Sequence, residues 1–327
     1  MYDVITIGTA TRDAFVRSKD FKTISSPEFI TGEGLCLPLG SKMDVDDIVF
    51  ATGGGATNAA VTFARQGLNT ACICKIGNDI SGREVLANLK QEKVATNFVI
   101  EDSANKTAYS ILLLSPNGER TILVYRGASE HFREGDINLR TLKAKWLYIA
   151  GSMPVDVLNS VLDKAKEVNT KVAYNPSRSE IKVGLNGLGE ILKKIDVLIL
   201  NREEGAYLTK IDYKKEEEIF KTLDGCVGGI VVLTDGARGA LVSDGRSIFE
   251  AGIFKDQKVI DRTGAGDAFG SGFVAGLAAE KDIQYAVRLA SANAASVVER
   301  VGAKDGILTK EEFEDGSRWR SLKIEIR

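Results

Sequence analysis

The sequence predicts an α/β protein whose core is one wound, mostly parallel β-sheet flanked by helices. Short apolar runs recur along the chain, and stretches with apolar residues three and four positions apart separate them. Buried parallel strands have the first pattern, and helices that pack on one face have the second. Because the two patterns alternate, we expect a single sheet with helices on its faces.

The expected elements follow in chain order. Strands are predicted at VITIG (4–8), TACICKIG (70–77), KWLYIAG (145–151), VAYNP (172–176), DVLILN (196–201) and GIVVLTDG (229–236). Helices are predicted at ATNAAVTFARQG (56–67), SGREVLANLKQEK (81–93), VDVLNSVLDKAKEV (155–168) and KEEEIFKTLDG (215–225).

Two segments interrupt the alternation. Residues 106–126 form two β-rich arms around the turn SPNG, and residues 14–52 are irregular and β-leaning. In α/β proteins such excursions usually cover the carboxyl edge of the sheet, where ligands bind. We therefore expect one α/β domain over residues 1–327 with a small β-rich lid formed at about 14–52 and 106–126. A decorative hairpin is the alternative, and the lid could also form a homodimer.

Composition restricts the function classes. The 327 residues are 44% apolar and 27% charged, which is typical of a soluble globular protein. With 43 basic and 45 acidic side chains the chain offers no field for nucleic acid or an anionic membrane. No apolar run approaches the roughly 20 residues of a membrane span, and none has the pattern of a signal peptide. We expect a cytoplasmic protein that acts on small molecules.

Cysteine and histidine usage excludes several active-site types. The four cysteines form no C-x-x-C pair, and Cys72 and Cys74 share one face of a predicted strand, which favours buried free thiols. His131 is the only histidine. A His-rich zinc site is therefore excluded, and a serine-hydrolase relay is disfavoured.

Three glycine-rich segments compete for a phosphate. The chain contains no Gly-Lys pair, which excludes a Walker A loop. GSGFVA (270–275) matches the G-x-G-x-x-G/A pattern of a dinucleotide-binding loop. It lies inside a predicted helix, however, where small residues usually allow close packing. A nicotinamide oxidoreductase is therefore a distant hypothesis.

The segment from Asp261 to Asp267 has a different character. We expect FKDQKVIDRT (254–263) to supply a strand, GAG (264–266) to form a loop with outward amides, and a helix to follow. Amides at a helix N-terminus can stabilise charge on a transferring phosphoryl group. Asp267, at the edge of such an anion hole, would accept the proton of a substrate hydroxyl. The alternative is that Asp267 only caps the helix.

These residues match a known family. DRTGAGDAFGSGFVAGL (261–277) resembles the second signature of the ribokinase-like carbohydrate kinases, also called the PfkB family, and GGGATNAAVTFARQG (53–67) resembles its glycine-rich substrate loop. Further similarities are Asp13 after ITIGTATR, KIGNDISG (75–82), NREE (201–204), TDGARG (234–239) and ASANAASVVERVGA (290–303). The resemblance covers about residues 4–303 and is weakest between Phe15 and Asp47.

The resemblance implies phosphorylation of an alcohol with ATP and Mg²⁺ on a ribokinase-like fold. It implies that Asp267 is the catalytic base and that Gly264, Ala265 and Gly266 form the anion hole. It implies a sugar-binding set of Asp13, Gly54, Gly55 and Asn58; a nucleotide-binding set of Thr234, Gly236, Gly239 and Asn293; a water-mediated Mg²⁺ site at Asn201 and Glu204; and a K⁺ site at Asp261 and Thr263. Without the resemblance, Asn201 and Glu204 have the pattern of a helix capping box, and both interpretations can hold together.

Departures from the family pattern concern the acceptor. Gly55 stands where true ribokinases carry a lysine, and Ser152 stands about where they place a sugar-contacting glutamate, which argues against ribose. The segment between Asp13 and Gly53 is longer than is usual in ribokinases. One hypothesis assigns Arg120, Arg126 and Arg178 to an acidic substrate such as a sugar phosphate or a ketogluconate.

Two alternatives to a sugar kinase stay open. A nucleoside kinase of the adenosine type would use the same ribose contacts, with Phe15, Phe50 or Tyr109 of the lid stacking on the base. A sugar- or nucleotide-sensing protein that kept the fold and lost the chemistry is the alternative from another class, and the intact GAGD argues against it.

Overall fold

The computed structural model describes residues 1–29, 32–115, 120–151 and 153–327. Within them, the main sheet has ten strands. Across the sheet these are β16 (Ile324–Ile326), β15 (Ile248–Ala251), β14 (Ala240–Ser243), β13 (Ile230–Thr234), β12 (Val197–Asn201), β11 (Lys171–Asn175), β10 (Ala144–Ala150), β1 (Tyr2–Gly8), β6 (Thr70–Gly77) and β7 (Ile100–Asp102). The strands from β13 to β7 pair in parallel, and β14, β15 and β16 continue the sheet antiparallel.

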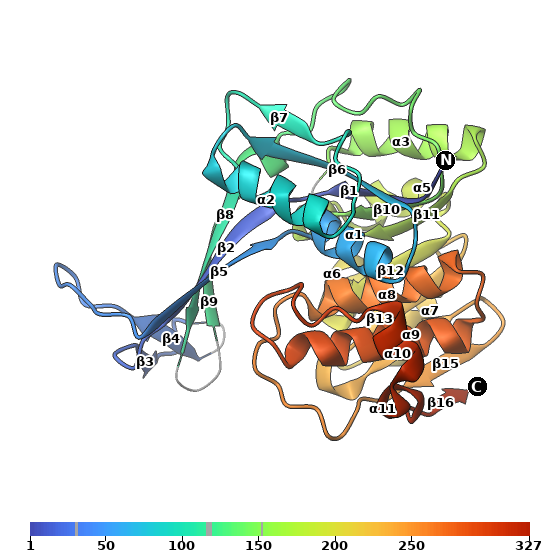
Figure 1. Ribbon diagram of the computed structural model, residues 1–327. Coiled ribbons are helices and arrows are strands. Elements are labelled where there is room, and N and C mark those ends of the chain that lie inside the picture. Colours follow the sequence, from blue (N-terminus) through green and yellow to red (C-terminus); the bar gives the residue numbers. More distant parts are fainter. Residues whose placement is uncertain (30–31, 116–119, 152) are drawn as a thin grey trace.

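Helices cover both faces of this sheet (Figure 1). Their bounds are α1 Gly55–Arg65, α2 Ile80–Gln91, α3 Val155–Glu167, α4 Arg178–Ile181, α5 Gly184–Leu192, α6 Arg202–Thr209, α7 Glu216–Asp224, α8 Ala265–Ala278, α9 Ile283–Val298, α10 Lys310–Asp315 and α11 Ser317–Arg320, with short 3-10 turns at Gly127–Glu130 and Gly236–Arg238. The apolar residues of α3, α5, α6 and α7 share a core with Ile5 and Ile7 of β1. Those of α1, α8 and α9 share a core with Val4 of the same strand.

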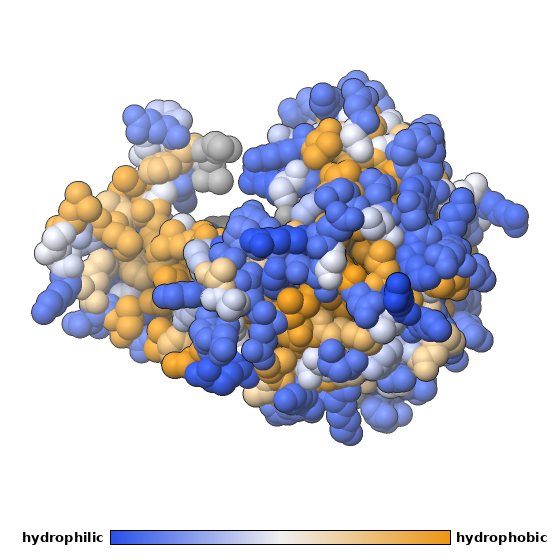
Figure 2. Space-filling view, turned by 90° about the horizontal axis from the view of Figure 1, so that it is seen from above, coloured by the Kyte–Doolittle hydropathy of each residue, from blue (hydrophilic) through white to orange (hydrophobic). Residues whose placement is uncertain are grey.

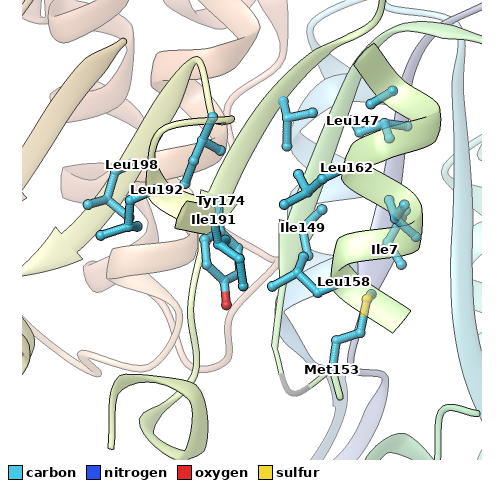
Figure 3. Close-up of a cluster of buried hydrophobic side chains, with 14 of the residues drawn as sticks. Ile7, Leu147, Ile149, Met153, Leu158, Leu162, Tyr174, Ile191, Leu192 and Leu198 are labelled. Atoms are coloured by element: carbon cyan, nitrogen blue, oxygen red, sulfur yellow. The ribbon is translucent and has the colours of Figure 1, made fainter. Parts of the chain in front are cut away.

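The alternation of side chains along each strand produces these two cores. In the first, Leu158 and Leu162 of α3 lie against Leu147 and Ile149 of β10, all at most 2% exposed (Figure 3). In the second, α8 and α9 are each other's main partners, with Gly272 and Gly276 of α8 against α9. A Cβ on Gly276 would lie 2.6 Å from the Cα of Ala286, so the helices approach closely only because this position lacks a side chain.

A second, smaller sheet projects from one edge of the molecule (Figure 1), and we call it the lid sheet. It comprises β5 (Asp47–Gly53), β2 (Thr11–Arg17), β8 (Ala108–Leu114) and β9 (Arg120–Tyr125). β2 pairs antiparallel with β5 and parallel with β8, and β8 pairs antiparallel with β9. A hairpin of β3 (Lys22–Ser25) and β4 (Glu33–Cys36) lies at its tip.

The predicted α/β class and the mostly parallel sheet are confirmed, and each of the six predicted strands and four predicted helices has a counterpart within a few residues. One expectation is wrong. FKDQKVIDRT (254–263) forms no strand, because β15 already ends at Ala251 and the amides of Ile260 and Asp261 donate to the carbonyl of Val298 on α9. An irregular loop therefore leads into α8.

Within the described part of the chain, no helix combines the length and the apolar character needed to cross a lipid bilayer.

Candidate functional site

The loop before α8 has the shape expected of an anion hole. Gly264 is the N-cap of α8 with φ of 79°, a left-handed conformation that favours glycine. A Cβ there would also lie 2.4 Å from the Cβ of Ala303, so both the backbone conformation and this close contact disfavour a side chain at the position. Nothing lies within 4 Å of the Cβ position of Gly266, which leaves the first turn of the helix open. The amide of Ala265 donates to the carbonyl of Arg262 at 3.4 Å, and Gly264 and Gly266 line a cavity at the N-terminus of α8, the positive end of the helix dipole.

Asp267, in the first turn of α8, is joined to the glycine-rich loop on α1. Its Oδ2 accepts a hydrogen bond of 2.8 Å from Nδ2 of Asn58, a residue 209 positions away in the chain. One turn further along α8, the hydroxyl of Ser271 donates to the backbone oxygen of Asp267 and lies 2.9 Å from the hydroxyl of Thr62 on α1. The two motifs that sequence analysis placed in one site therefore share one hydrogen-bonded cluster.

Asp13 and the glycines at the start of α1 form the next part of the site. Asp13, on β2, is 6% exposed and accepts from the hydroxyl of Thr11. A Cβ on Gly53 would lie 2.1 Å from its Oδ2, so only glycine leaves room for the carboxylate. Gly54, with φ of 99°, approaches the carbonyl of Thr9, and the amide of Gly55 donates to the hydroxyl of Thr9. The glycine-rich loop before α1 is thus fixed against the end of β1.

Two adjoining cavities open at the carboxyl ends of the parallel strands, where ligands bind in this class of fold. The smaller, of about 190 Å³, is bounded by the ends of β11 and β12 and by Gly264, Gly266 and Asp267. The larger, of about 380 Å³, extends between the turn after β13 and α9 and is mostly apolar. Asn201, Thr234 and Gly266 line both. Gly236 and Gly239 line the larger cavity.

Burial and neighbouring charges shift the pKa values of the carboxyl groups of Asp267 and Asp13. Burial raises the pKa of Asp267 above its ordinary value; the hydrogen bond from Asn58 opposes this rise, and the negative charge of Asp13 adds to it. Burial also raises the pKa of Asp13. A carboxylate with a raised pKa beside an anion hole is suited to accept a proton from a hydroxyl.

Asn201 and Glu204 form the reciprocal capping box that the sequence indicated. The amide of Glu204 donates to Oδ1 of Asn201 at 2.8 Å, and the amide of Asn201 donates to Oε2 of Glu204 at 2.9 Å. Burial raises the pKa of Glu204, and the charge of Asp267 contributes. No cluster of three His, Cys, Asp or Glu side chains that could hold a metal occurs among the described residues. The pair therefore fits Mg²⁺ only if phosphate and water oxygens supply most of its ligands.

Asp261 and Thr263 connect the loop before α8 to the loop after α9. Asp261 is 4% exposed, and its Oδ1 accepts from the amide and hydroxyl of Thr263 at 3.0 and 2.7 Å. Its Oδ2 accepts from the amide of Gly302 at 3.0 Å. Both carboxylate oxygens are thus engaged by the protein, so backbone carbonyls would have to supply most ligands of a K⁺ ion here.

Asn293 was expected to belong to the nucleotide-binding set, on a helix that borders the adenine, and in the structure its side chain is engaged in the core. It is fully buried, its Nδ2 donates to the carbonyl of Ala268, and its Oδ1 accepts from the amide of Leu308. Its amide therefore ties α9 to α8 and to the following loop. Ser291, Ala294 and Ala295 of the same helix line the larger cavity instead.

The residues considered for acceptor choice lie apart from these cavities. Ser152 falls outside the described residues. Arg126 pairs with Glu130 on the surface, Arg178 is exposed, and neither these two nor Arg120 lines the two cavities.

Several lining residues were not anticipated. Asn175 ends β11 in the smaller cavity and donates to the carbonyl of Ile199. Its position, a polar residue at the carboxyl end of a buried strand, is a signal that could have identified it. Phe254 and Val298 also line the larger cavity, but neither the pattern of 254–263 nor that of 290–303 assigns an apolar residue to a binding role.

Comparison with known proteins places this arrangement in a family. The model of the pfkB family carbohydrate kinases matches residues 30–310. An uncharacterized sugar kinase of Archaeoglobus fulgidus is 30% identical over 249 residues, which are 75% of this chain and 97% of that protein. Ribokinase of Haemophilus influenzae is 30% identical over 269 residues, 80% of this chain and 86% of the enzyme.

A solved structure shares the fold. Arabidopsis thaliana ribokinase, complexed with ribose and ATP, superposes with a TM-score of 0.78 at 19% identity over 96% of this chain and 98% of the other. The chain therefore belongs to the pfkB family of carbohydrate kinases and is a phosphotransferase with a ribokinase-like fold.

Proposed function

We propose that the protein transfers the γ-phosphoryl group of ATP to a hydroxyl of a sugar or sugar-like small molecule, with Asp267 as the catalytic base. The observation that carries this proposal is the 2.8 Å hydrogen bond from Asn58 to Asp267, because it joins the candidate acceptor site to the anion hole. The acceptor would lie between Asp13, Gly54, Gly55 and Asn58, with the nucleotide along the two cavities.

The chemistry follows from this placement. The acceptor hydroxyl gives its proton to the carboxylate of Asp267 while its oxygen forms a bond to the γ-phosphorus, and the bond from that phosphorus to the bridging oxygen breaks to release ADP. The amides of Gly264, Ala265 and Gly266 stabilise the charge on the phosphoryl oxygens. Asn201 and Glu204 would hold Mg²⁺ through water, and the bound ion would neutralise part of the phosphate charge. In the single domain that we propose over residues 1–327, the lid sheet covers the site and excludes water.

Replacement of Asp267 tests the base. D267N removes the proton acceptor and keeps the shape, so turnover is expected to fall at least about 100-fold while nucleotide and acceptor binding survive. D305N, which changes an exposed aspartate of a nearby loop, is the matched control and should keep its activity. Unchanged turnover of D267N would remove Asp267 from this role.

The acceptor is found by an ADP-release screen against sugars, sugar acids, sugar phosphates and nucleosides. We expect activity among the sugars. A negative result in all pools, together with retained ligand binding, would favour the sensing protein.

The lid sheet also supports a sugar over a nucleoside. Side chains alternate across a strand, and in the ladders of β2 the residues Phe50 and Tyr109 lie opposite Ala14 and Arg12, on the face away from Asp13. Phe50 is 51% exposed and packs under the guanidinium of Arg12. Of the three aromatic candidates only Phe15 shares the face of Asp13.

We also propose that the protein forms a homodimer through the outer face of the lid sheet. Ile48, Phe50, Ile111, Leu123 and Tyr125 lie on that face and are 37% to 52% exposed. Figure 2 shows hydrophobic side chains gathered over the projecting part of the molecule. Patches of this kind usually mark an interface. Sedimentation of the protein and of F50D measures the oligomeric state, and a wild-type monomer would exclude the dimer.

A further inference from the structure

The loop between α9 and α10 carries a buried lysine that the proposed chemistry does not use. Lys304 is 5% exposed, and its Nζ donates to Oγ1 of Thr52 at 2.9 Å and to Oδ1 of Asn88 at 3.1 Å. Thr52 lies at the inner end of lid strand β5, and Asn88 lies on α2. A single side chain from the C-terminal part of the protein thus holds the root of the lid sheet.

Lys304 differs from the other buried lysine in how its charge is compensated. Lys75, equally buried, forms ion pairs with Asp136 at 2.8 Å and Asp102 at 3.6 Å. Among the ion pairs of the described residues, none includes Lys304. Burying an ammonium group without a contacting carboxylate is unfavourable, and burial lowers the pKa of Lys304 to about 8. A feature that reduces stability in this way is most readily explained by a functional role.

The backbone around Lys304 contacts the anion hole. The amide of Gly302 donates to Asp261, and Ala303 fills the space beside Gly264. The carbonyl of Lys304 accepts from Arg65 on α1 at 3.1 Å. The loop that positions the ammonium group is therefore fixed to the loop that would bind the phosphoryl group.

The hydrogen bond to Thr52 also brings the ammonium group of Lys304 close to Asp13. Thr52 precedes Gly53, and the carboxylate of Asp13 lies against Gly53. The positive charge of Lys304 lowers the pKa values of Asp13 and Asp267, in opposition to the effect of their burial. Because Asp13 and Asp267 repel each other, a fixed cation near both favours the state in which both are ionised.

We propose that Lys304 is a positioning residue that anchors the root of lid strand β5 through Thr52 and supplies the fixed positive charge near Asp13 and Asp267. This inference rests on the proposed function, which makes Asp267 the base. The titratable and charged groups that face Lys304 come from β2, β6, α1, α8 and the end of α2; they are Asp13, Cys72, Cys74, Arg65, Asp267 and Glu92.

The experiment separates the charge from the anchor. K304M removes both, K304Q removes the charge and keeps a donor, and T52V removes the hydroxyl and keeps the charge. Carboxyl ¹³C NMR titrations of Asp13 and Asp267, assigned with D13N and D267N, are recorded on the free protein. The acid limb of kcat/KM is recorded with the acceptor from the screen.

In K304M and K304Q both carboxyl midpoints and the acid limb are expected to move about one pH unit upward. T52V should leave the midpoints in place and raise the KM of the acceptor several-fold. K75Q, which neutralises the other buried lysine, should leave both midpoints in place.

Unchanged carboxyl midpoints in K304M would overturn the proposal, and if K304M does not fold, K304Q decides in the same way. The NMR result needs no turnover. Failure of the proposed function, seen as an active D267N, is therefore distinguishable from failure of this inference.

Discussion

Lys304 makes a quantitative prediction about stability and pH. Its pKa in the folded protein is about 8, against an ordinary value of 10.5. Below pH 8 both folded and unfolded chains hold this proton, and the full unfavourable effect of the buried charge is present. Between about pH 8 and 10.5 the unfolded chain holds the proton and the folded chain does not, so the free energy of unfolding rises with pH.

The magnitude follows from the same two values. A difference of about 2.5 pKa units, at 1.36 kcal/mol per unit, corresponds to about 3 kcal/mol. The free energy of unfolding of the wild-type protein minus that of K304M should therefore increase by about 3 kcal/mol from pH 7 to pH 10.5. Methionine keeps the length of the side chain without its proton, so K304M lacks this dependence.

Urea denaturation at pH 7, 8, 9, 10 and 10.5 measures the difference. Both proteins carry Cys72→Ala and Cys74→Ala, because the charges of these two thiols raise the pKa of Lys304. Without them the pKa of Lys304 is lower, so the predicted increase is at least as large. Other lysines and tyrosines titrate in both proteins and cancel. A difference that stays constant to within about 0.5 kcal/mol over this range would refute a buried, uncompensated ammonium group at this position.

Three further predictions test other parts of the site. In G270A the new Cβ would lie 2.6 Å from the hydroxyl of Tyr148, so the free energy of unfolding should fall by about 1–3 kcal/mol and be partly restored in G270A/Y148F; equal losses in both variants would contradict this contact. E204Q should weaken the apparent Mg²⁺ affinity about tenfold in activity assays while nucleotide binding without Mg²⁺ is kept, and an unaltered Mg²⁺ dependence would remove Glu204 from the ion's surroundings. Turnover should be higher in K⁺ than in K⁺-free buffer if Asp261 and Thr263 border a cation, and equal rates would exclude K⁺ activation.

Local sequence patterns were sufficient to predict six central strands of the main sheet. Buried parallel strands must be apolar along their whole length, so runs such as VITIG and DVLILN identify β1 and β12 without tertiary information. The segment 261–277 likewise indicated a loop of amides before a helix, and the structure has Gly264 in a left-handed conformation at that position. The capping box of Asn201 and Glu204 could also be predicted from the sequence, because the two residues are three positions apart.

Predictions failed where long-range contacts decide the local structure. The composition of FKDQKVIDRT resembles that of a strand. The amides of Ile260 and Asp261, however, donate to the carbonyl of Val298 on α9 and not to the sheet. Asn293 has the polarity of a ligand-binding residue, but its side-chain amide bonds to the backbone of Ala268 and Leu308 in the core. In both cases the deciding partner lies on another element.

The sequence by itself determined the α/β class, the family and the identity of the residues around the anion hole, because each depends on patterns within a short stretch of chain. Only the tertiary structure decided that Asn58 bonds to Asp267 and that Lys304 lies beneath the lid, 252 positions from Thr52. Burial, charge and hydrogen bonding between distant segments are fixed by how helices and strands pack, and no local pattern encodes them.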